Sequence, residues 1–256
     1  MLNMLRADFY RLSKIKGFWI TQALILLFVF MTIKTSTVGH LGVVDGKELQ
    51  QAAQSYGESW NGVVSVSAVQ SMGDALLYFI LPLLVFIIGT DFTKGTYKNI
   101  LTVGVSRYKY FFSKLISFTI VLTIQLIMIC IVAFITGVIL NTTGDVTIDF
   151  IKNTLEVLGI QMIFLLAIAV LASALLFITK NNVVSIIFTI VFPAVLAILH
   201  LLNPNVRLYE ILDFSTALKL ATSLDFDLLK YCLMGALSTI VLGNVVIAQV
   251  FKRQEL

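Results

Sequence analysis

Six apolar runs divide the chain, and each is long enough, or nearly so, to cross a lipid bilayer as a helix. A helix that crosses hydrocarbon needs about 20 residues at a rise of about 1.5 Å per residue. Apolar and polar residues do not alternate within the runs, which excludes membrane-spanning strands. Six transmembrane helices are therefore predicted, near residues 17–33, 74–89, 112–140, 155–178, 183–202 and 228–250.

The first sixteen residues predict an amphipathic helix that lies along the membrane surface. Leu2, Leu5, Phe9 and Leu12 recur at helical spacing, and the basic residues lie mostly off that face. An ordinary basic flank of the first span is the alternative. The residues predicted at the membrane interface are Arg6, Phe9, Arg11, Lys14 and Lys16.

A polar and basic stretch at residues 91–111 separates the second run from the third. Gly95 and Gly104 permit sharp turns, and Tyr97, Ile100 and Leu101 recur at positions i, i+3 and i+4 between them. This pattern predicts a short amphipathic helix over residues 96–103. Such a helix could bind a soluble partner, and the alternative is a basic loop without one.

Two further segments lie between the runs. Residues 34–73 form a long first loop that reaches into the mixed stretch before the second run. Residues 203–227 are half apolar, which predicts short re-entrant or interfacial helices before the last span. The predicted fold class is an all-α integral membrane protein with a single transmembrane domain over residues 1–256.

Composition supports this class. Hydrophobic residues make up 59% of the 256 residues and charged residues 12%, whereas soluble domains are about half apolar. The first run is too long for the core of a signal peptide and has no cleavage site after it, so we expect it to be retained as a span. Cys130 and Cys232 lie within apolar runs, which predicts neither a disulfide nor a metal site.

The distribution of basic residues predicts the orientation. With the N-terminus in the cytoplasm, about twice as many lysines and arginines fall on the inner side as on the outer side. Both termini and residues 91–111 are therefore predicted to be cytoplasmic. The net charge of +4 then reflects topology, and no basic stripe with interleaved aromatic residues indicates nucleic-acid binding.

Motifs for catalysis are absent from the sequence. It contains neither the HExxH pattern of zinc hydrolases nor the GxxxxGK[ST] pattern of ATP-binding loops. Ser106 has no nearby histidine to act as its base. The chain is therefore predicted not to be an enzyme and to bind no metal or cofactor of its own.

Polar residues within the runs are few, and no charged residue lies at the centre of a run. This argues against an ion-coupled carrier or pump. Hydrogen bonds between helices are the alternative role for the glutamines. The candidate residues of a substrate path are Gln125, Gln161 and Asn244.

The stretch DFTKGTYKNILTVGVSRYKYFFSK resembles a segment of the permease subunits of type-2 ABC exporters. The resemblance is to a six-span branch of Gram-positive bacteria that exports antimicrobial peptides, lantibiotics and toxin peptides, and it covers nearly the whole chain. Many members have glutamate in place of Asp91 and proline in place of Gly104 or Val105. The matching positions are Asp91, Gly95, Thr96, Leu101, Ser106, Arg107 and Lys114.

The resemblance implies a multi-pass permease in the plasma membrane, which pairs with a second permease and two separate ATPase subunits. These ATPases would bind ATP and Mg²⁺, and the helix within residues 91–111 would be the coupling helix that docks on one of them. Tyr97, Ile100 and Leu101 would be its apolar anchors. The implied coupling residues are Asp91, Lys94, Gly95, Thr96, Tyr97, Lys98, Ile100, Leu101, Ser106 and Arg107.

The resemblance also implies partners and cargo. The basic residues of the coupling loop would pair with acidic groups of the ATPase or with phosphates of membrane lipids. The expected substrate is an amphipathic peptide. Export of drugs, lipids or ions is the alternative, as is a scaffold or sensor that does not transport.

Overall fold

Helices make up nearly all of the structure. The computed structural model describes every residue except 1, 38–59, 103, 204–205, 224–225 and 254–256, so most of the predicted first loop lies outside the described residues. No strand occurs among those described. Six segments are long and apolar enough to cross a membrane, as predicted: Lys16–Thr35, Gly73–Thr93, Arg107–Leu140, Ile148–Thr179, Asn182–His200 and Asp227–Val250.

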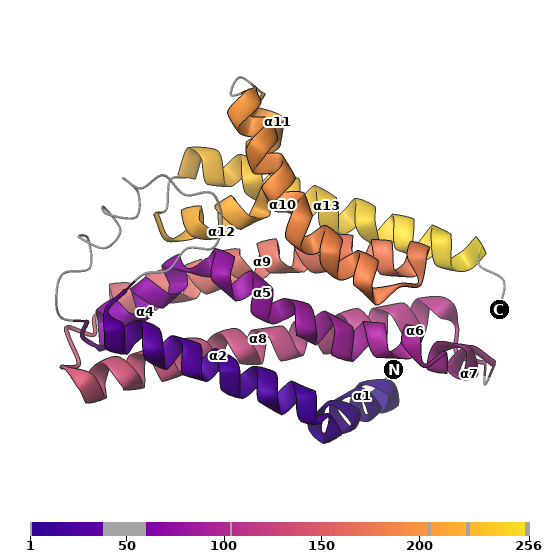
Figure 1. Cartoon of the computed structure of the whole chain (residues 1–256), viewed down its shortest axis with the longest axis horizontal. Helices are drawn as coiled ribbons and strands as arrows, with labels where there is room; N and C mark the ends of the chain where they lie inside the picture. The colour runs from indigo at the N-terminus through magenta and orange to yellow at the C-terminus, as the bar shows by residue number, and fades with distance from the viewer. Residues whose placement is uncertain (1, 38–59, 103, 204–205, 224–225, 254–256) are drawn as a thin grey trace.

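The long helices run side by side along one axis (Figure 1). At one end of the bundle lie α1, α7 and the last turns of α13, and we call this the N-terminal end. The opposite end holds α4 and the connection between α8 and α9. The helices are α1 (Leu2–Lys14), α2 (Lys16–Thr35), α4 (Gly62–Ser71), α5 (Gly73–Leu84), η1 (Val85–Gly89), α6 (Thr90–Thr93), α7 (Thr96–Thr102), α8 (Arg107–Leu140), α9 (Ile148–Thr179), α10 (Asn182–Leu202), α11 (Arg207–Leu212), α12 (Phe214–Ser223) and α13 (Phe226–Arg253).

Polar side chains set where several of these helices begin. Asn61, Ser106 and Thr147 each accept a hydrogen bond from a backbone N–H in the first turn of α4, α8 and α9. The first backbone N–H groups of a helix have no partner within it, so such caps fix the start of the helix. Ser106, predicted as a coupling residue, has this capping role.

The second span is not one regular helix. It is assembled from α5, the π-helical turn η1 and α6, and α4 precedes it. Pro82 lies in α5 one turn before η1 and has no N–H to donate to the preceding turn. A π-helical turn shifts the hydrogen-bond register, and such turns occur frequently at functional sites.

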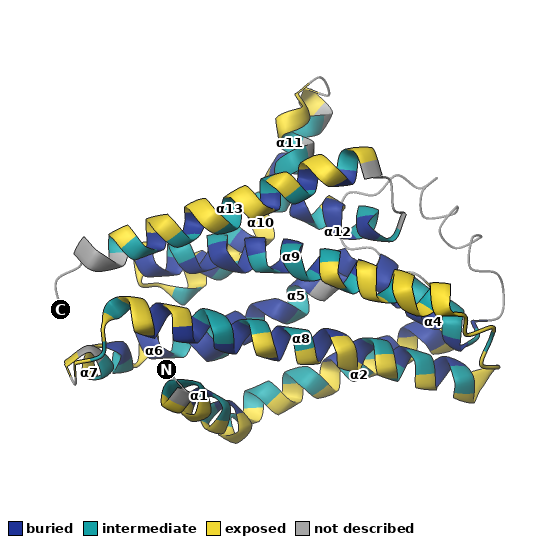
Figure 2. Cartoon of the chain, turned by 180° about the vertical axis from the view of Figure 1, so that it is seen from behind, coloured by how far each residue is buried: buried dark blue, intermediate teal, exposed yellow. Residues whose placement is uncertain are grey.

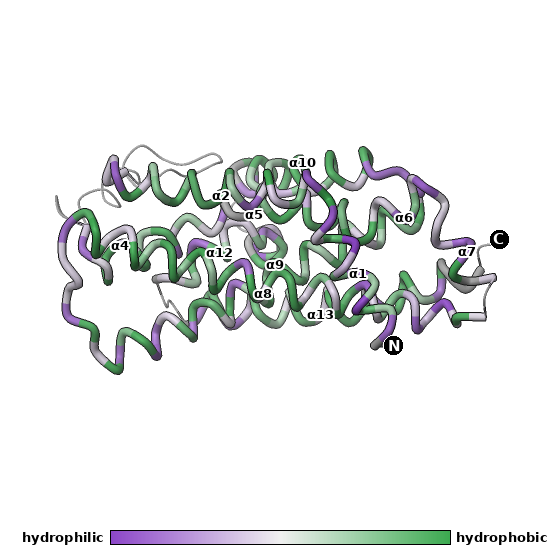
Figure 3. Tube along the Cα trace, turned by 90° about the horizontal axis from the view of Figure 1, so that it is seen from below, coloured by the Kyte–Doolittle hydropathy of each residue, from purple (hydrophilic) through white to green (hydrophobic). Residues whose placement is uncertain are grey.

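The second span and α9 form the interior of the bundle. They are 65% and 61% buried, against 17% for α10 and 22% for α13. The exposed stripes of the outer helices carry large apolar side chains, which suit contact with lipid (Figures 2 and 3). Two short helices, α11 and α12, precede the last span, and their re-entrant or interfacial placement stays a prediction.

Candidate functional site

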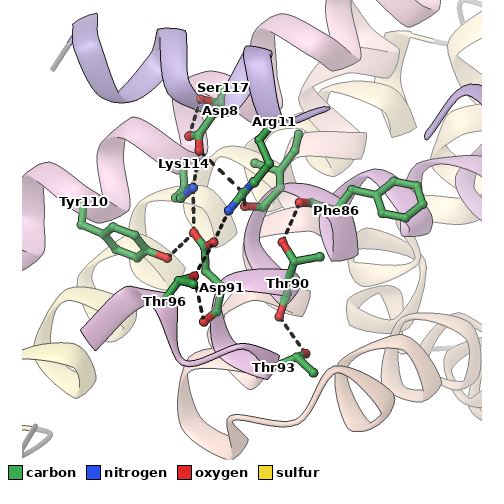
Figure 4. A network of polar contacts seen from close by, with 12 residues as sticks. Asp8, Arg11, Phe86, Thr90, Asp91, Thr93, Thr96, Tyr110, Lys114 and Ser117 are labelled. Atoms are coloured by element: carbon green, nitrogen blue, oxygen red, sulfur yellow. Dashed lines mark hydrogen bonds and ion pairs between the residues drawn. The ribbon is translucent and has the colours of Figure 1, made fainter. Parts of the chain in front are cut away.

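Four charged side chains meet at the N-terminal end of the bundle, where α1, α6 and α8 come together (Figure 4). Lys114 Nζ lies 2.7 Å from Asp91 Oδ2 and also contacts Asp8 directly. Arg11 contacts Asp91 directly and lies 3.6 Å from Asp8 Oδ1. Two carboxylates are therefore balanced by two cations from different helices.

The carboxylates also accept hydrogen bonds from neutral side chains. Tyr110 donates its hydroxyl to Asp91 Oδ2 at 2.9 Å, and Thr96 donates to Asp91 Oδ1 at 2.9 Å. Ser117 donates to Asp8 Oδ2 at 3.1 Å. We call this set the Asp91 cluster: Asp8, Arg11, Asp91, Thr96, Tyr110, Lys114 and Ser117.

The centre of the Asp91 cluster is buried. Asp91 is 0% exposed and Lys114 is 2% exposed. A charge is costly to remove from water unless it is paired and hydrogen-bonded, and here both conditions are met. Because each buried charge needs its partner, the cluster stabilises the contact between its helices only while all its members remain in place.

Helical spacing brings the members of the cluster to one place. Asp8 and Arg11 stand at i and i+3 on α1, with the buried Leu12 on the same face. Tyr110, Lys114 and Ser117 stand at i, i+4 and i+7 along α8. Asp91 lies two residues after the end of the π-helical turn, in α6.

The cluster also contacts the irregular part of the second span. Arg11 donates a second hydrogen bond from Nη2 to the carbonyl oxygen of Ile87 at 3.0 Å. Thr90 and Thr93 donate to the carbonyls of Phe86 and Gly89 at 2.9 and 3.0 Å. Side chains thus satisfy carbonyls in and around η1, and one of them comes from α1.

Beyond the cluster, α7 lies between two glycine turns, as the sequence predicts. Gly95 has φ of +66° and Gly104 has φ of +93°, in the left-handed region that favours glycine. The helix covers residues 96–102 between them. Its direction is therefore set by two sharp turns and by the Thr96 hydrogen bond to Asp91.

The structure corrects the role expected of Tyr97 as an exposed anchor. Tyr97 is buried, and its ring stacks on Phe92 at 4.8 Å between centroids. Phe92 in turn packs edge-on against Phe177 of α9 at 4.8 Å. Tyr97 thus belongs to the protein's own core.

The other predicted coupling residues separate into interior and exterior positions. Asp91 is the buried centre of the cluster and not a loop residue. Lys94 and Lys98 are exposed, Ile100 packs partly against the core, and Arg107 is partly buried. The backbone of Leu101 belongs to α7, and its side chain lies outside what the structure describes.

The predicted membrane-interface residues also differ in whether they are exposed or face the interior of the protein. Arg6, Lys14 and Lys16 are exposed, and Phe9 packs partly against the core. Arg11 is the correction, because it turns inward to Asp91 and Ile87. A residue three positions from Asp8 shares its face of the helix, and that face meets α8.

The three residues predicted for a substrate path have separate surroundings. Gln161 donates to the carbonyl of Gln70 at 2.7 Å and so joins α9 to α4. Asn244 bonds the carbonyl of Ile240 within its own helix at 2.7 Å. Gln125 lines a groove between α1, α2 and α8. Gln161 therefore has the alternative role expected of the glutamines, a hydrogen bond between helices.

At the N-terminal end of the bundle, the connection between α9 and α10 also contacts the segment around Asp91. Asn182, the first residue of α10 after the tight turn from α9, donates from Nδ2 to Thr93 Oγ1 at 2.8 Å. The same amide packs against Gly89, where an added Cβ would lie 2.7 Å from Asn182 Oδ1. The tight turn and the polar stretch are thus in direct contact.

Buried charges were the main feature that sequence reasoning missed. The sequence does not distinguish Asp8 as a site residue, and Lys114 stands out only as a position of the family pattern. At the opposite end, Lys219 of α12 lies 3.3 Å from Asp74, which is 1% exposed. An acidic residue on the apolar side of a basic helix, as at Asp8, is the signal that could have indicated a buried partner.

The sequence profile described as ABC-2 family transporter protein matches residues 4–195. The chain belongs to this ABC-2 family. The matched region extends from α1 into α10, so it contains the whole Asp91 cluster and α7. No curated protein sequence matches the chain.

Membership of the ABC-2 family indicates which part of a transporter this chain is. An ABC-2 family protein of this kind is the membrane component and not the ATPase. It implies partnership with ABC ATPase subunits, which fits the lack of an ATP-binding motif. The Asp91 cluster is therefore a candidate site for transmitting motion between such a partner and the membrane helices.

Proposed function

We propose that this ABC-2 chain is a permease subunit of an ATP-driven exporter. It works with a second permease, identical or different, and with two separate ATPase subunits that bind ATP and Mg²⁺. The observation that supports this most is the position of Asp91, which joins the segment before α7 to both α1 and α8. An element that moves α7 would pull on these contacts.

The Asp91 cluster gives this coupling a physical basis. Thr96 is the first residue of α7 and bonds Asp91 directly. Separating a buried ion pair leaves an uncompensated charge and costs about 3–5 kcal/mol. A displacement of α7 is therefore more easily accommodated by moving α1 and α8 together with Asp91 than by breaking the cluster. The π-helical turn before α6 is the place where the second span can change its path.

The exposed side of the α6–α7 segment is the proposed docking face for the ATPase. Lys94 and Lys98 lie there and would pair with acidic groups of the partner. Of the contacts expected of this segment, the electrostatic ones are retained, because Tyr97 is buried. The proposed orientation has both termini and α7 in the cytoplasm, in the plasma membrane of a Gram-positive bacterium.

The proposed cargo is an amphipathic or hydrophobic peptide, such as an antimicrobial peptide, a lantibiotic or a toxin peptide. The resemblance to the peptide-exporting branch supports this choice. Drugs, lipids and ions are the alternative substrates, and a scaffold that does not transport is the alternative function.

The test uses the permease reconstituted in liposomes with its ABC ATPase partner. The double variant Lys94→Glu and Lys98→Glu is expected to abolish association with the ATPase and the stimulation of ATP hydrolysis. Lys152→Glu with Lys230→Glu is the matched control, because both lysines are exposed and belong to α9 and α13, outside the α6–α7 segment. Unchanged coupling in the first variant would overturn the docking assignment.

Cargo is tested in the same liposomes with a panel of cationic peptides, a drug set and labelled lipids. We expect ATP-dependent movement of at least one peptide. Movement of a drug or lipid alone would change the substrate class. Association without any ATP-dependent movement would favour the scaffold.

A further inference from the structure

We propose that the groove between α1, α2 and α8 is a binding site for one acyl chain of an anionic phospholipid. The groove has a volume of about 450 Å³, and its α1 residues Phe9 and Leu12 are sequence neighbours of Asp8 and Arg11 of the Asp91 cluster. Its walls include Phe9 of α1, Leu26 of α2 and Met128 of α8. This inference concerns a lipid site and does not depend on the proposed transport function.

The walls of the groove favour a flexible apolar chain. Within a bilayer no water has to be displaced, so binding there depends on close contact between atoms. Leu12, Leu26, Val121 and Met128 offer such contacts over a continuous surface from three helices. A lipid that enters from the surrounding leaflet needs no rearrangement of the helices to reach them.

Two buried amide groups give the site polarity. Gln22 and Gln125 both line the groove, and Gln125 is only 3% exposed. Neither Nε2 of Gln22 nor Oε1 of Gln125 has a hydrogen-bond partner among the described residues. An unpaired buried amide is costly, so a ligand that offers both an acceptor and a donor is favoured. The ester carbonyl and the free hydroxyl of phosphatidylglycerol meet this requirement.

Charge at the bend between α1 and α2 selects an anionic headgroup. Lys14 and Lys16 are exposed there, next to Ser13, which lines the groove. Trp19 is 58% exposed and donates from Nε1 to the carbonyl of Ser13 at 2.9 Å, which fixes the bend. Exposed tryptophan and lysine at such a bend are typical of a membrane interface, where lysine attracts lipid phosphate.

The site would also brace α1. Phe9 and Leu12 line the groove, while Asp8 and Arg11 of the same helix form the Asp91 cluster. A chain held between α1 and α8 adds contacts to the same pair of helices that the ions join. Bound lipid therefore favours the arrangement in which the cluster is closed.

The experiment uses the full-length protein in phosphatidylcholine nanodiscs that contain phosphatidylglycerol with a diazirine in one acyl chain. After illumination, mass spectrometry identifies the labelled peptides. We expect labels on the peptides that carry Gln22 and Met128, in excess over the lipid-facing surface of α10. The variant Ala23→Trp fills the groove and should reduce this labelling several-fold. Leu24→Trp is the control, because Leu24 is exposed on the same helix and does not line the groove.

A second variant keeps the test independent of folding. Gln125→Leu preserves the size of the side chain and should reduce the preference for labelled phosphatidylglycerol over a diazirine phosphatidylcholine. Equal labelling of all lipid-facing surfaces, or no effect of Ala23→Trp in a folded protein, would overturn the site. Displacement of the label by a transported peptide would overturn the choice of ligand.

Discussion

Lys114 Nζ lies 2.7 Å from Asp91 Oδ2, so a buried ion pair fastens the third span to the end of the second. The polar stretch that separates these spans in the sequence thus begins inside the protein. Asp91 has no exposed surface, and every group that it contacts comes from a different turn or helix. Several properties of the protein depend on this contact.

Removing one partner of the pair should be worse than removing both. Lys114→Met leaves Asp91 short of one cation, and Asp91→Asn leaves Lys114 short of one anion. Each is expected to lower the free energy of unfolding by about 3–5 kcal/mol. The double variant leaves Asp8 with Arg11, a balanced pair 3.6 Å apart, and should recover part of the loss. The melting temperature in detergent measures this, and a fully additive loss would contradict the cluster's charge balance.

Arg11→Lys should weaken the attachment of α1 although it preserves the charge. Arginine serves both Asp91 and the carbonyl of Ile87 through two nitrogen atoms, and a lysine ammonium cannot reproduce that planar fork. Faster hydrogen exchange in α1 is the expected result. Lys14→Arg is the control, because Lys14 is exposed and should leave exchange unchanged. Equal exchange in both variants would show that Arg11 acts only as a point charge.

Gly95 should accept asparagine more readily than valine. An added Cβ meets no atom within 4 Å there, so the backbone φ of +66° is the main restriction. The left-handed region costs an ordinary residue about 1–2 kcal/mol, and asparagine visits it most easily. We expect Gly95→Asn to retain ATPase stimulation and Gly95→Val to lose most of it. Similar activities for the two would show that the direction of α7 does not matter.

Gly89→Ala should destabilise the protein through Asn182. The new Cβ would lie 2.7 Å from Asn182 Oδ1, closer than such atoms normally approach. Asn182→Ala removes the obstructing amide together with its bond to Thr93, so it should cost a little alone and rescue Gly89→Ala. Melting temperatures of the two single variants and the double variant test this coupling. If the double variant melts no higher than Gly89→Ala, the contact is not the cause.

Gln161→Leu should affect stability slightly and transport not at all. Gln161 joins α9 to the carbonyl of Gln70 at 2.7 Å. Hydrogen bonds between membrane helices contribute about 0.6 kcal/mol on average. Transport and thermal unfolding of the same preparation distinguish the two roles. A large change in transport at unchanged melting temperature would restore Gln161 to a substrate path.

The candidate site was only partly predictable. Gly95 and Gly104 mark the turns on either side of α7, because glycine adopts the left-handed region freely. The burial of Tyr97 was not predictable, because the spacing of apolar residues on a short helix does not show whether the protein's own core or a partner covers them. The inward direction of Arg11 was hidden for the same reason, since a basic residue beside a membrane also fits the lipid surface.

The sequence by itself determined the number of spans, the helix at each, the short helix between two glycine turns and the helices before the last span. Length, apolar content and backbone hydrogen bonding leave a lipid-embedded chain few other choices. Only the tertiary structure decided which charges are buried together. Asp8, Asp91 and Lys114 are far apart in the sequence, and each is costly to bury alone. Their pairing depends on α1 folding back onto α8, which no local pattern specifies.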